Sequence, residues 1–187
     1  MKPLVRMFTS HLLPEQTVYD LFEWKLRDVY ITNHETGEAI CDMKDLEFPS
    51  HFSQQATDII ASKYFRKRQV PHDSYLSGPG AHPTIEHETS FKELVHRMVN
   101  FWMLSLLDER LIASDESQIF YDEVAYLLIA QMFAPNSPQW FNTGLYHAYG
   151  IQGSPLSYYY DEGLGEVIPS HDGYSRTQAS ACFILSV

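Results

Sequence analysis

The spacing of apolar residues predicts that most of the first 134 residues are helical. Apolar side chains recur every three or four positions in four stretches, which is the pattern of a helix with one buried face. The third stretch is the strongest, because Ser90 followed by Glu93 has the spacing of a capping box at the start of a helix. The four predicted helices span residues 14–26, 51–67, 91–112 and 117–133.

A different pattern, strict alternation, predicts a hairpin over residues 28–43. Val29 and Ile31 lie on one face of the first predicted strand and Ile40 lies on the opposite face of the second. Between them the sequence NHETG supplies turn residues and ends on Gly37. The hairpin therefore separates the first two predicted helices.

After residue 135 the composition changes to Pro, Gly, Ser, Asn and Tyr, which predicts irregular structure with short strands. The two apolar pieces within this part, residues 156–160 and 181–187, are predicted strands. Residues 70–88 are predicted to be a loop because they are rich in Pro and Gly. The outline is a mainly helical domain over residues 1–134, followed by a strand-based part over 135–187.

Charge and composition limit the function. Thirteen Lys and Arg residues against 24 Asp and Glu residues give a formal net charge of −11 with no basic stripe, so we expect no direct binding to nucleic acid. No apolar run approaches the roughly 20 residues that span a bilayer, so we expect no membrane segment. The two cysteines, Cys41 and Cys182, lie far apart, and residues 1–10 lack the apolar core of an export signal. We therefore expect a cytoplasmic protein with reduced thiols.

Residues 133–144, FAPNSPQWFNTG, are the first candidate for chemistry. Asn136 and Ser137 offer short hydrogen-bonding side chains beside a Pro-restricted turn, and Gly144 follows closely. This combination suits an anion or a hydroxylated ligand. The competing interpretation is a loop that stops a helix through an Asx-type turn.

Cys182 is the second candidate. Ala179, Ser180 and Ala181 precede it and would let another molecule approach the backbone, but a thiol in an apolar strand is most often a small hydrophobic residue. A reactive thiol needs a partner, and Cys41 is an unpersuasive one. A pairing with His171 and Asp172 would instead indicate a small Cys–His hydrolase.

Histidines and acids in GAHPTIEHE raise the question of a metal site. The residues are His82, Glu86, His87 and Glu88, but their order is not HExxH and Pro83 interrupts any helix through them. We therefore predict no metal site in this chain. The tyrosines at 158–160 are predicted to pack or to face an interface.

Two late motifs, NSPQWFNTGL and SACFILSV, together resemble the entry to the catalytic barrel of adenosylcobalamin-dependent (class II) ribonucleotide reductases. Three upstream stretches, FSQQATDIIASKYFRK, ETSFKELVHRMVNFW and YDEVAYLLIAQMFAPNSP, are similar to the helical N-terminal region of the same enzymes. The resemblance extends from about residue 15 to the end. It implies an α+β fold, in which a mainly helical N-terminal domain leads into the first strand of a ribonucleotide reductase α/β barrel.

The resemblance also implies roles for six residues. Cys182 would be one of two cysteines that reduce the ribonucleotide substrate to a deoxyribonucleotide, after a thiyl radical elsewhere has removed the 3′-hydrogen. An external dithiol would then reduce the resulting disulfide. Gln139 departs from the Thr that often stands at its position, so a hydroxyl contact there would be lost. The implied substrate contacts are Asn136, Ser137, Gln139, Ser180 and Ala181.

Several parts of such an enzyme have no counterpart in these 187 residues. They are the radical cysteine, the disulfide partner, the later barrel strands and the contacts to adenosylcobalamin. We therefore expect the N-terminal piece of a larger reductase, inactive alone, whose remainder belongs to the same chain or is encoded separately. The alternative is a non-catalytic helical interaction module that docks on a separately encoded catalytic chain.

Overall fold

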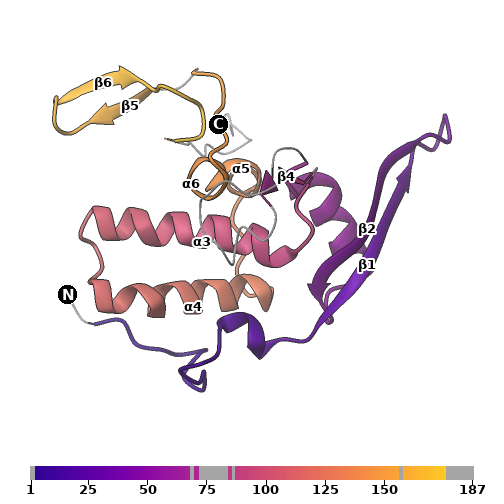
Figure 1. Ribbon diagram of the computed structural model, residues 1–187, viewed down its shortest axis with the longest axis horizontal. Helices are drawn as coiled ribbons and strands as arrows, with labels where there is room; N and C mark the ends of the chain where they lie inside the picture. Colours follow the sequence, from indigo (N-terminus) through magenta and orange to yellow (C-terminus); the bar gives the residue numbers. More distant parts are fainter. Residues whose placement is uncertain (1–2, 68–69, 72–83, 86, 156–157, 176–187) are drawn as a thin grey trace, which may run out of the picture.

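The computed structural model describes residues 3–67, 70–71, 84–85, 87–155 and 158–175. Two antiparallel helices, α3 (Phe91–Asp108) and α4 (Ser117–Ile129), form the centre of the molecule. A long hairpin, β1 (Trp24–Thr32) and β2 (Ala39–Pro49), extends from one end of this pair, as Figure 1 shows. The chain is thus a small α+β domain, which agrees with the predicted class; the described residues show no barrel.

The hairpin was predicted correctly. Val29 pairs with Met43 and Ile31 pairs with Cys41, and both Val29 and Cys41 are buried, whereas Ile40 faces solvent. Gly37 at the turn has φ +73°, a left-handed conformation that glycine adopts without steric cost. Alternation of this kind fixes the register, because a slip of one residue would expose the whole buried face.

The helix predicted for residues 14–26 was wrong. Only one 3₁₀ turn, η1 (Val18–Leu21), forms there, and Phe22 is already extended. From Trp24 onward the backbone pairs with β2, where Trp24 lies opposite Pro49 and Leu26 opposite Glu47. Hydrogen bonding to a neighbouring strand therefore outweighs the local helical spacing.

The other three predicted helices are confirmed. Residues 51–67 contain α1 (Gln54–Ile59) and a π-helical turn, η2 (Ile60–Tyr64). The capping box of α3 forms: the Ser90 hydroxyl accepts the N–H of Lys92, and the Glu93 carboxylate accepts the N–H of Ser90. The short 3₁₀ helix η3 (Ser114–Glu116) leads into α4, which ends at Ile129 rather than at 133.

Short elements complete the described chain. Strands β3 (Val70–Pro71) and β4 (Thr84–Ile85) pair within the stretch predicted as a loop. Helices α5 (Ser137–Asn142) and α6 (Leu145–Tyr149) lie against α3, and a second hairpin follows, β5 (Tyr158–Asp161) and β6 (Glu166–Pro169). The predicted strand over 156–160 is thus confirmed for residues 158–160, while the one over 181–187 lies outside the described residues.

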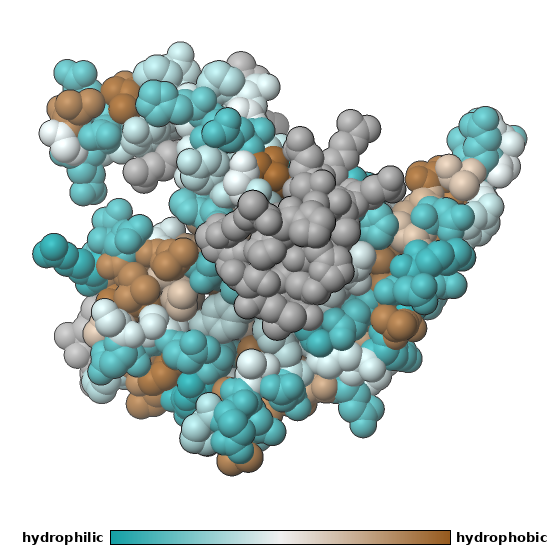
Figure 2. Space-filling view, viewed as in Figure 1, coloured by the Kyte–Doolittle hydropathy of each residue, from teal (hydrophilic) through white to brown (hydrophobic). Residues whose placement is uncertain are grey.

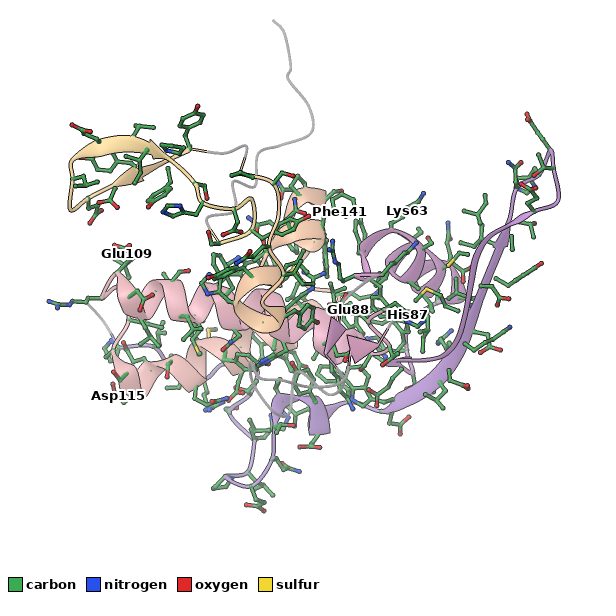
Figure 3. All side chains as sticks on the ribbon, turned by 45° about the horizontal axis from the view of Figure 1, so that its top comes forward. Lys63, His87, Glu88, Glu109, Asp115 and Phe141 are labelled. Carbon is green, nitrogen blue, oxygen red and sulfur yellow. The ribbon has the colours of Figure 1, made fainter. Side chains whose placement is uncertain are left out.

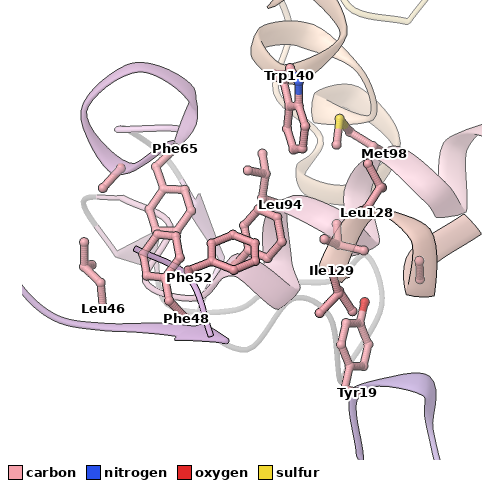
Figure 4. Close-up of a cluster of buried hydrophobic side chains, with 14 of the residues drawn as sticks. Tyr19, Leu46, Phe48, Phe52, Phe65, Leu94, Met98, Leu128, Ile129 and Trp140 are labelled. Carbon is pink, nitrogen blue, oxygen red and sulfur yellow. The ribbon is translucent and has the colours of Figure 1, made fainter. Parts of the chain in front are cut away.

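A cluster of aromatic rings joins the hairpin, the C-cap of η2, α3 and α5 into one core (Figure 4). The Phe48 ring lies 5.3 Å from that of Phe65 and 5.9 Å from that of Phe91, and the Phe91 ring lies 6.3 Å from that of Trp140. Aromatic pairs at such separations add roughly 0.5–1.5 kcal/mol beyond the burial of their area. Trp140 therefore ties α5 to the core of the helical part.

The surface carries hydrophobic side chains as well. Figure 2 shows them over the ends of α3 and α4 that lie beneath the β5–β6 hairpin. Leu104 and Leu111, near the C-terminal end of α3, are among the exposed hydrophobic residues. Within the described part of the chain, no helix has the length and apolar character needed to cross a membrane.

Candidate functional site

Within the candidate ligand-binding stretch, residues 133–144, residues 137–142 form the short helix α5, and residues 133–136 are irregular, as in the competing interpretation of a loop that stops a helix. Asn136 is the N-cap residue of α5, yet its side chain makes no capping hydrogen bond. Pro138 lies in the first turn, where proline costs no hydrogen bond and sets the helical φ. Proline here lies at the start of a helix, which neither of the two interpretations of the sequence pattern predicts.

The three described candidate residues of this stretch differ in exposure and partners. Asn136 is exposed, while Ser137 and Gln139 are half-buried. The Ser137 hydroxyl lies 3.3 Å from the hydroxyl of Tyr64 in η2. The side-chain oxygen of Gln139 accepts a hydrogen bond from the Thr143 hydroxyl. The other three candidates, Ser180, Ala181 and Cys182, lie outside the described residues.

Behind α5 lies a buried ion pair that the sequence pattern did not predict. Arg97 of α3 is 1% exposed and Glu88 is 0% exposed, and the Arg97 Nε atom lies 2.7 Å from the Glu88 Oε1 atom. Arg97 Nη2 donates to the carbonyl of Trp140 at 2.7 Å, and Nη1 donates to the carbonyl of Thr143 at 2.9 Å. Nη2 also lies 3.3 Å from the carbonyl of Tyr64. The guanidinium therefore supplies hydrogen-bond donors to the carbonyls at the end of α5.

Glu88 is equally well enclosed. Its Oε2 atom accepts the backbone N–H of Arg66 at 2.7 Å, and its Oε1 atom accepts the Tyr149 hydroxyl at 2.6 Å. Burial, together with the negative charge of Glu88, raises the pKa of Tyr149 well above its ordinary value, so the hydroxyl stays protonated and donates. Figure 3 shows Glu88 and, above it, Phe141 on α5.

Gly144, the N-cap residue of α6, explains how the connection from α5 to α6 comes so close to α3. Its φ is +80°, and a Cβ atom there would lie 1.8 Å from the Arg97 carbonyl oxygen and 2.5 Å from its carbonyl carbon. Both atoms are backbone, so no side-chain rotation could relieve the clash. Only glycine fits this conformation and this distance together.

A second buried polar cluster lies between η1, α3 and α4. The Tyr121 hydroxyl is 2.7 Å from the Tyr19 hydroxyl and 2.8 Å from His96 Nδ1. Burial raises the pKa of Tyr121 and lowers the pKa of His96, so both groups are neutral near pH 7. The Tyr121 hydroxyl therefore links α4 to η1 and α3.

The structure gives no support to the metal hypothesis among the residues it describes, which contain no group of three or more His, Cys, Asp or Glu side chains placed to hold an ion. Both Glu88 oxygens already have partners, and His87 Nδ1 contacts the Glu88 carbonyl at 2.8 Å. His82 and Glu86, also named in that hypothesis, lie outside the described residues.

The pair proposed for a hydrolase is only partly described. His171 is exposed, whereas Asp172 is buried and its Oδ1 atom accepts the N–H groups of Tyr174 and Ser175 at 2.7 and 2.8 Å. Burial alone would raise the pKa of Asp172, but these hydrogen bonds outweigh it and lower the pKa. Asp172 thus stabilises a turn, and the thiol that a hydrolase would need is not described.

Comparison with known proteins matches this chain to enzymes of a single kind. The family model described as class II vitamin B12-dependent ribonucleotide reductase matches residues 26–131. A vitamin B12-dependent ribonucleotide reductase of Bradyrhizobium diazoefficiens is 34% identical over 205 aligned positions, which cover 98% of this chain and 16% of that protein. The enzyme of the same name from Agrobacterium fabrum is 35% identical over 97% of this chain, and that from Streptomyces coelicolor is 36% identical over 75%. The chain spans about 16% of the length of the first two.

Proposed function

Because this chain belongs to the family of class II vitamin B12-dependent ribonucleotide reductases, we propose that it is the N-terminal part of such an enzyme. Residues 1–134 then form the helical N-terminal domain, and residues 135–187 begin the catalytic α/β barrel. The observation that carries this proposal is the alignment of 98% of the chain with one of these reductases.

In this proposal Cys182 is the reductant next to the substrate. Its thiol gives a proton to the 2′-hydroxyl of the ribose, the C–O bond breaks, and water leaves. Cys182 and a partner cysteine outside this chain together supply two electrons, a C–H bond forms at the 2′-carbon, and the two sulfurs end as a disulfide. An external dithiol restores both thiols by exchange. Adenosylcobalamin supplies the radical that begins turnover.

The proposed substrate contacts are Asn136, Ser137, Gln139, Ser180 and Ala181. The structure supports the first part of this set, because Asn136 at the N-cap of α5 is exposed and its side chain makes no capping hydrogen bond. The ribonucleotide carries hydroxyl and phosphate oxygens, which accept hydrogen bonds from a side-chain amide such as that of Asn136.

The cavity where α3 connects to α4 does not fit the cofactor itself. The cavity at the connection of α3 and α4, lined by Leu4, Arg110 and Leu111 among others, has a volume of about 680 Å³. Drug-sized ligands occupy pockets of roughly 300–1,000 Å³, and a corrin ring with its nucleotide tail is much larger than such ligands. We therefore assign cobalamin binding to the remainder of the enzyme.

The test is a chimera in which this chain replaces the matching region of the Bradyrhizobium enzyme. With ribonucleotide, adenosylcobalamin and a dithiol, the chimera should form deoxyribonucleotide, whereas the isolated chain should form none. Cys182→Ser should lower turnover by roughly 10³-fold or more, as expected when a group that reacts with substrate is removed. Cys41→Ser is the matched control and should be nearly silent. A Cys182→Ser chimera that keeps a tenth of the activity would refute the assigned role.

One observation favours the second candidate, an interaction module that docks on a separately encoded catalytic chain. Trp102 of α3 and the i, i+4, i+7 series Phe120, Val124 and Leu127 of α4, together with Phe133, line an apolar groove of about 370 Å³. A helix with such an additional apolar stripe is typical of one that is covered on several sides. If this candidate is right, the chimera will be inactive, and the isolated chain will bind the rest of the reductase when the two are mixed.

A further inference from the structure

We propose that Arg97 is a positioning residue for α5, the helix that carries Asn136 at its N-cap and Ser137 and Gln139 within it. The proposal rests on the proposed function in one respect, that these three residues contact substrate. It concerns a residue far from them in sequence: the bonds from Arg97 to Trp140 and Thr143 join residues 43 and 46 positions apart.

Helix α5 cannot hold its own position. It has six residues, and an isolated helix shorter than roughly 12–15 residues is marginal in water. Its place must therefore come from contacts with the rest of the fold. Three such contacts are the stacking of Tyr64 on Trp140, with ring centres 5.6 Å apart, the hydroxyl pair of Tyr64 and Ser137, and the Arg97 hydrogen bonds.

Among these contacts the Arg97 bonds have the most restrictive geometry. Two nitrogens of one planar group reach two carbonyls of one short helix and its C-cap, while the third side of the group faces Glu88. This geometry fixes both the position and the direction of the end of α5. A lysine would keep the charge, but its single ammonium group cannot reproduce the planar fork.

The ion pair links α5 to its surroundings as well. Glu88 holds the N–H of Arg66 just after η2 and the hydroxyl of Tyr149 at the end of α6. Removing one partner of such a buried pair leaves an uncompensated charge, so the arrangement tolerates little displacement. A shift of α5 away from α3 would break the carbonyl bonds of Arg97, and a shift toward α3 would press Gly144 against the α3 backbone. The candidate substrate residues are therefore held by a charged group in the core.

The test compares Arg97→Lys and Tyr149→Phe with Tyr121→Phe in the purified chain. Tyr121→Phe is the matched control, because it also removes a buried hydroxyl from a polar cluster, but one whose hydrogen bonds join α4 to η1 and α3. Hydrogen exchange is measured by mass spectrometry over residues 137–144 and over the β1–β2 hairpin, which contains none of the three substituted residues. Arg97→Lys should speed exchange over 137–144 about tenfold relative to the hairpin, which corresponds to the loss of about one hydrogen bond. Tyr149→Phe should act in the same direction and more weakly, whereas Tyr121→Phe should not change this ratio.

If Arg97→Lys does not fold, Tyr149→Phe carries the test. An unchanged ratio in the folded variants would overturn the proposal. The chimera then separates this inference from the proposed function, because Arg97→Lys should raise KM for the ribonucleotide more than it lowers kcat, and Tyr121→Phe should leave KM unchanged. Faster exchange without any rise in KM would mean that Arg97 does position α5 but that α5 does not contact substrate.

Discussion

Replacing Gly144 by alanine tests a close approach of two backbones, that of the α5–α6 connection and that of α3. The new Cβ atom would lie 1.8 Å from the Arg97 carbonyl oxygen, so this connection or α3 must move. Holding a non-glycine residue in the left-handed region costs about 1–2 kcal/mol. Forcing an extra carbon into a packed site costs about 1–3 kcal/mol more. We therefore expect Gly144→Ala to lower the free energy of unfolding by about 2–5 kcal/mol.

Gly150→Ala is the matched control. Gly150 also has a left-handed φ, +67°, but nothing lies within 4 Å of the position that its Cβ would occupy. This variant should lose only the conformational part, about 1–2 kcal/mol. Thermal unfolding followed by circular dichroism compares the two, and each kcal/mol corresponds to a shift of about 2–4 °C for a chain of this size. If the two variants melt within about a degree of each other, the close approach of Gly144 to Arg97 does not exist in solution.

Two further predictions concern stability. Ser90→Ala should lower the free energy of unfolding, measured by urea titration, by about 1 kcal/mol, because the N-cap of α3 is lost. The control is Ser105→Ala, which removes only a hydrogen bond to a carbonyl of its own helix. It should change the free energy of unfolding by less than about 0.5 kcal/mol. Burial alone would raise the pKa of Glu123, but hydrogen bonds from Phe8 and Thr9 outweigh it and lower the pKa below its usual 4.5. Stability from this carboxylate is therefore present above pH 4.5 and is lost as the pH falls through its lowered pKa. Unfolding midpoints from about pH 6 to about pH 3 should fall less for Glu123→Gln than for the unchanged chain, and equal slopes would contradict this.

Sequence periodicity predicted the elements that depend on neighbours along the chain. The α3 helix begins where its capping box indicates, and the first hairpin turns around Gly37, because both signals are local. The wrong predictions occur where contacts between residues far apart in the sequence determine the local structure. Residues 24–26 become strand because β2 lies beside them, and residues 137–142 become helix because α3 supplies partners for their last carbonyls.

The candidate site likewise contains residues that the sequence could identify and one that it could not. Asn136, Ser137 and Gln139 could be selected from their motif, whereas Arg97 could not, because it stands among the apolar residues of α3. Leu94, Val95, Met98 and Val99 around it are all buried, so the one signal was a charged residue within an otherwise buried stretch. Its partners could not be found by spacing, since Glu88 precedes it by 9 residues and the Thr143 carbonyl follows it by 46.

Several of the groups that enclose the Arg97 guanidinium are synthesised after Arg97 itself, and this order affects how the protein folds during translation. Tyr149 is translated 52 residues after Arg97. At about 5–20 residues per second, the ribosome leaves an interval of roughly 3–10 s in which the helix with the arginine exists without the carbonyls and the hydroxyl that later enclose it. During that interval the guanidinium can remain hydrated, and the charged pair becomes buried only when its last partners emerge. We therefore expect burial of this charge to be completed late in the cotranslational folding of this part of the chain.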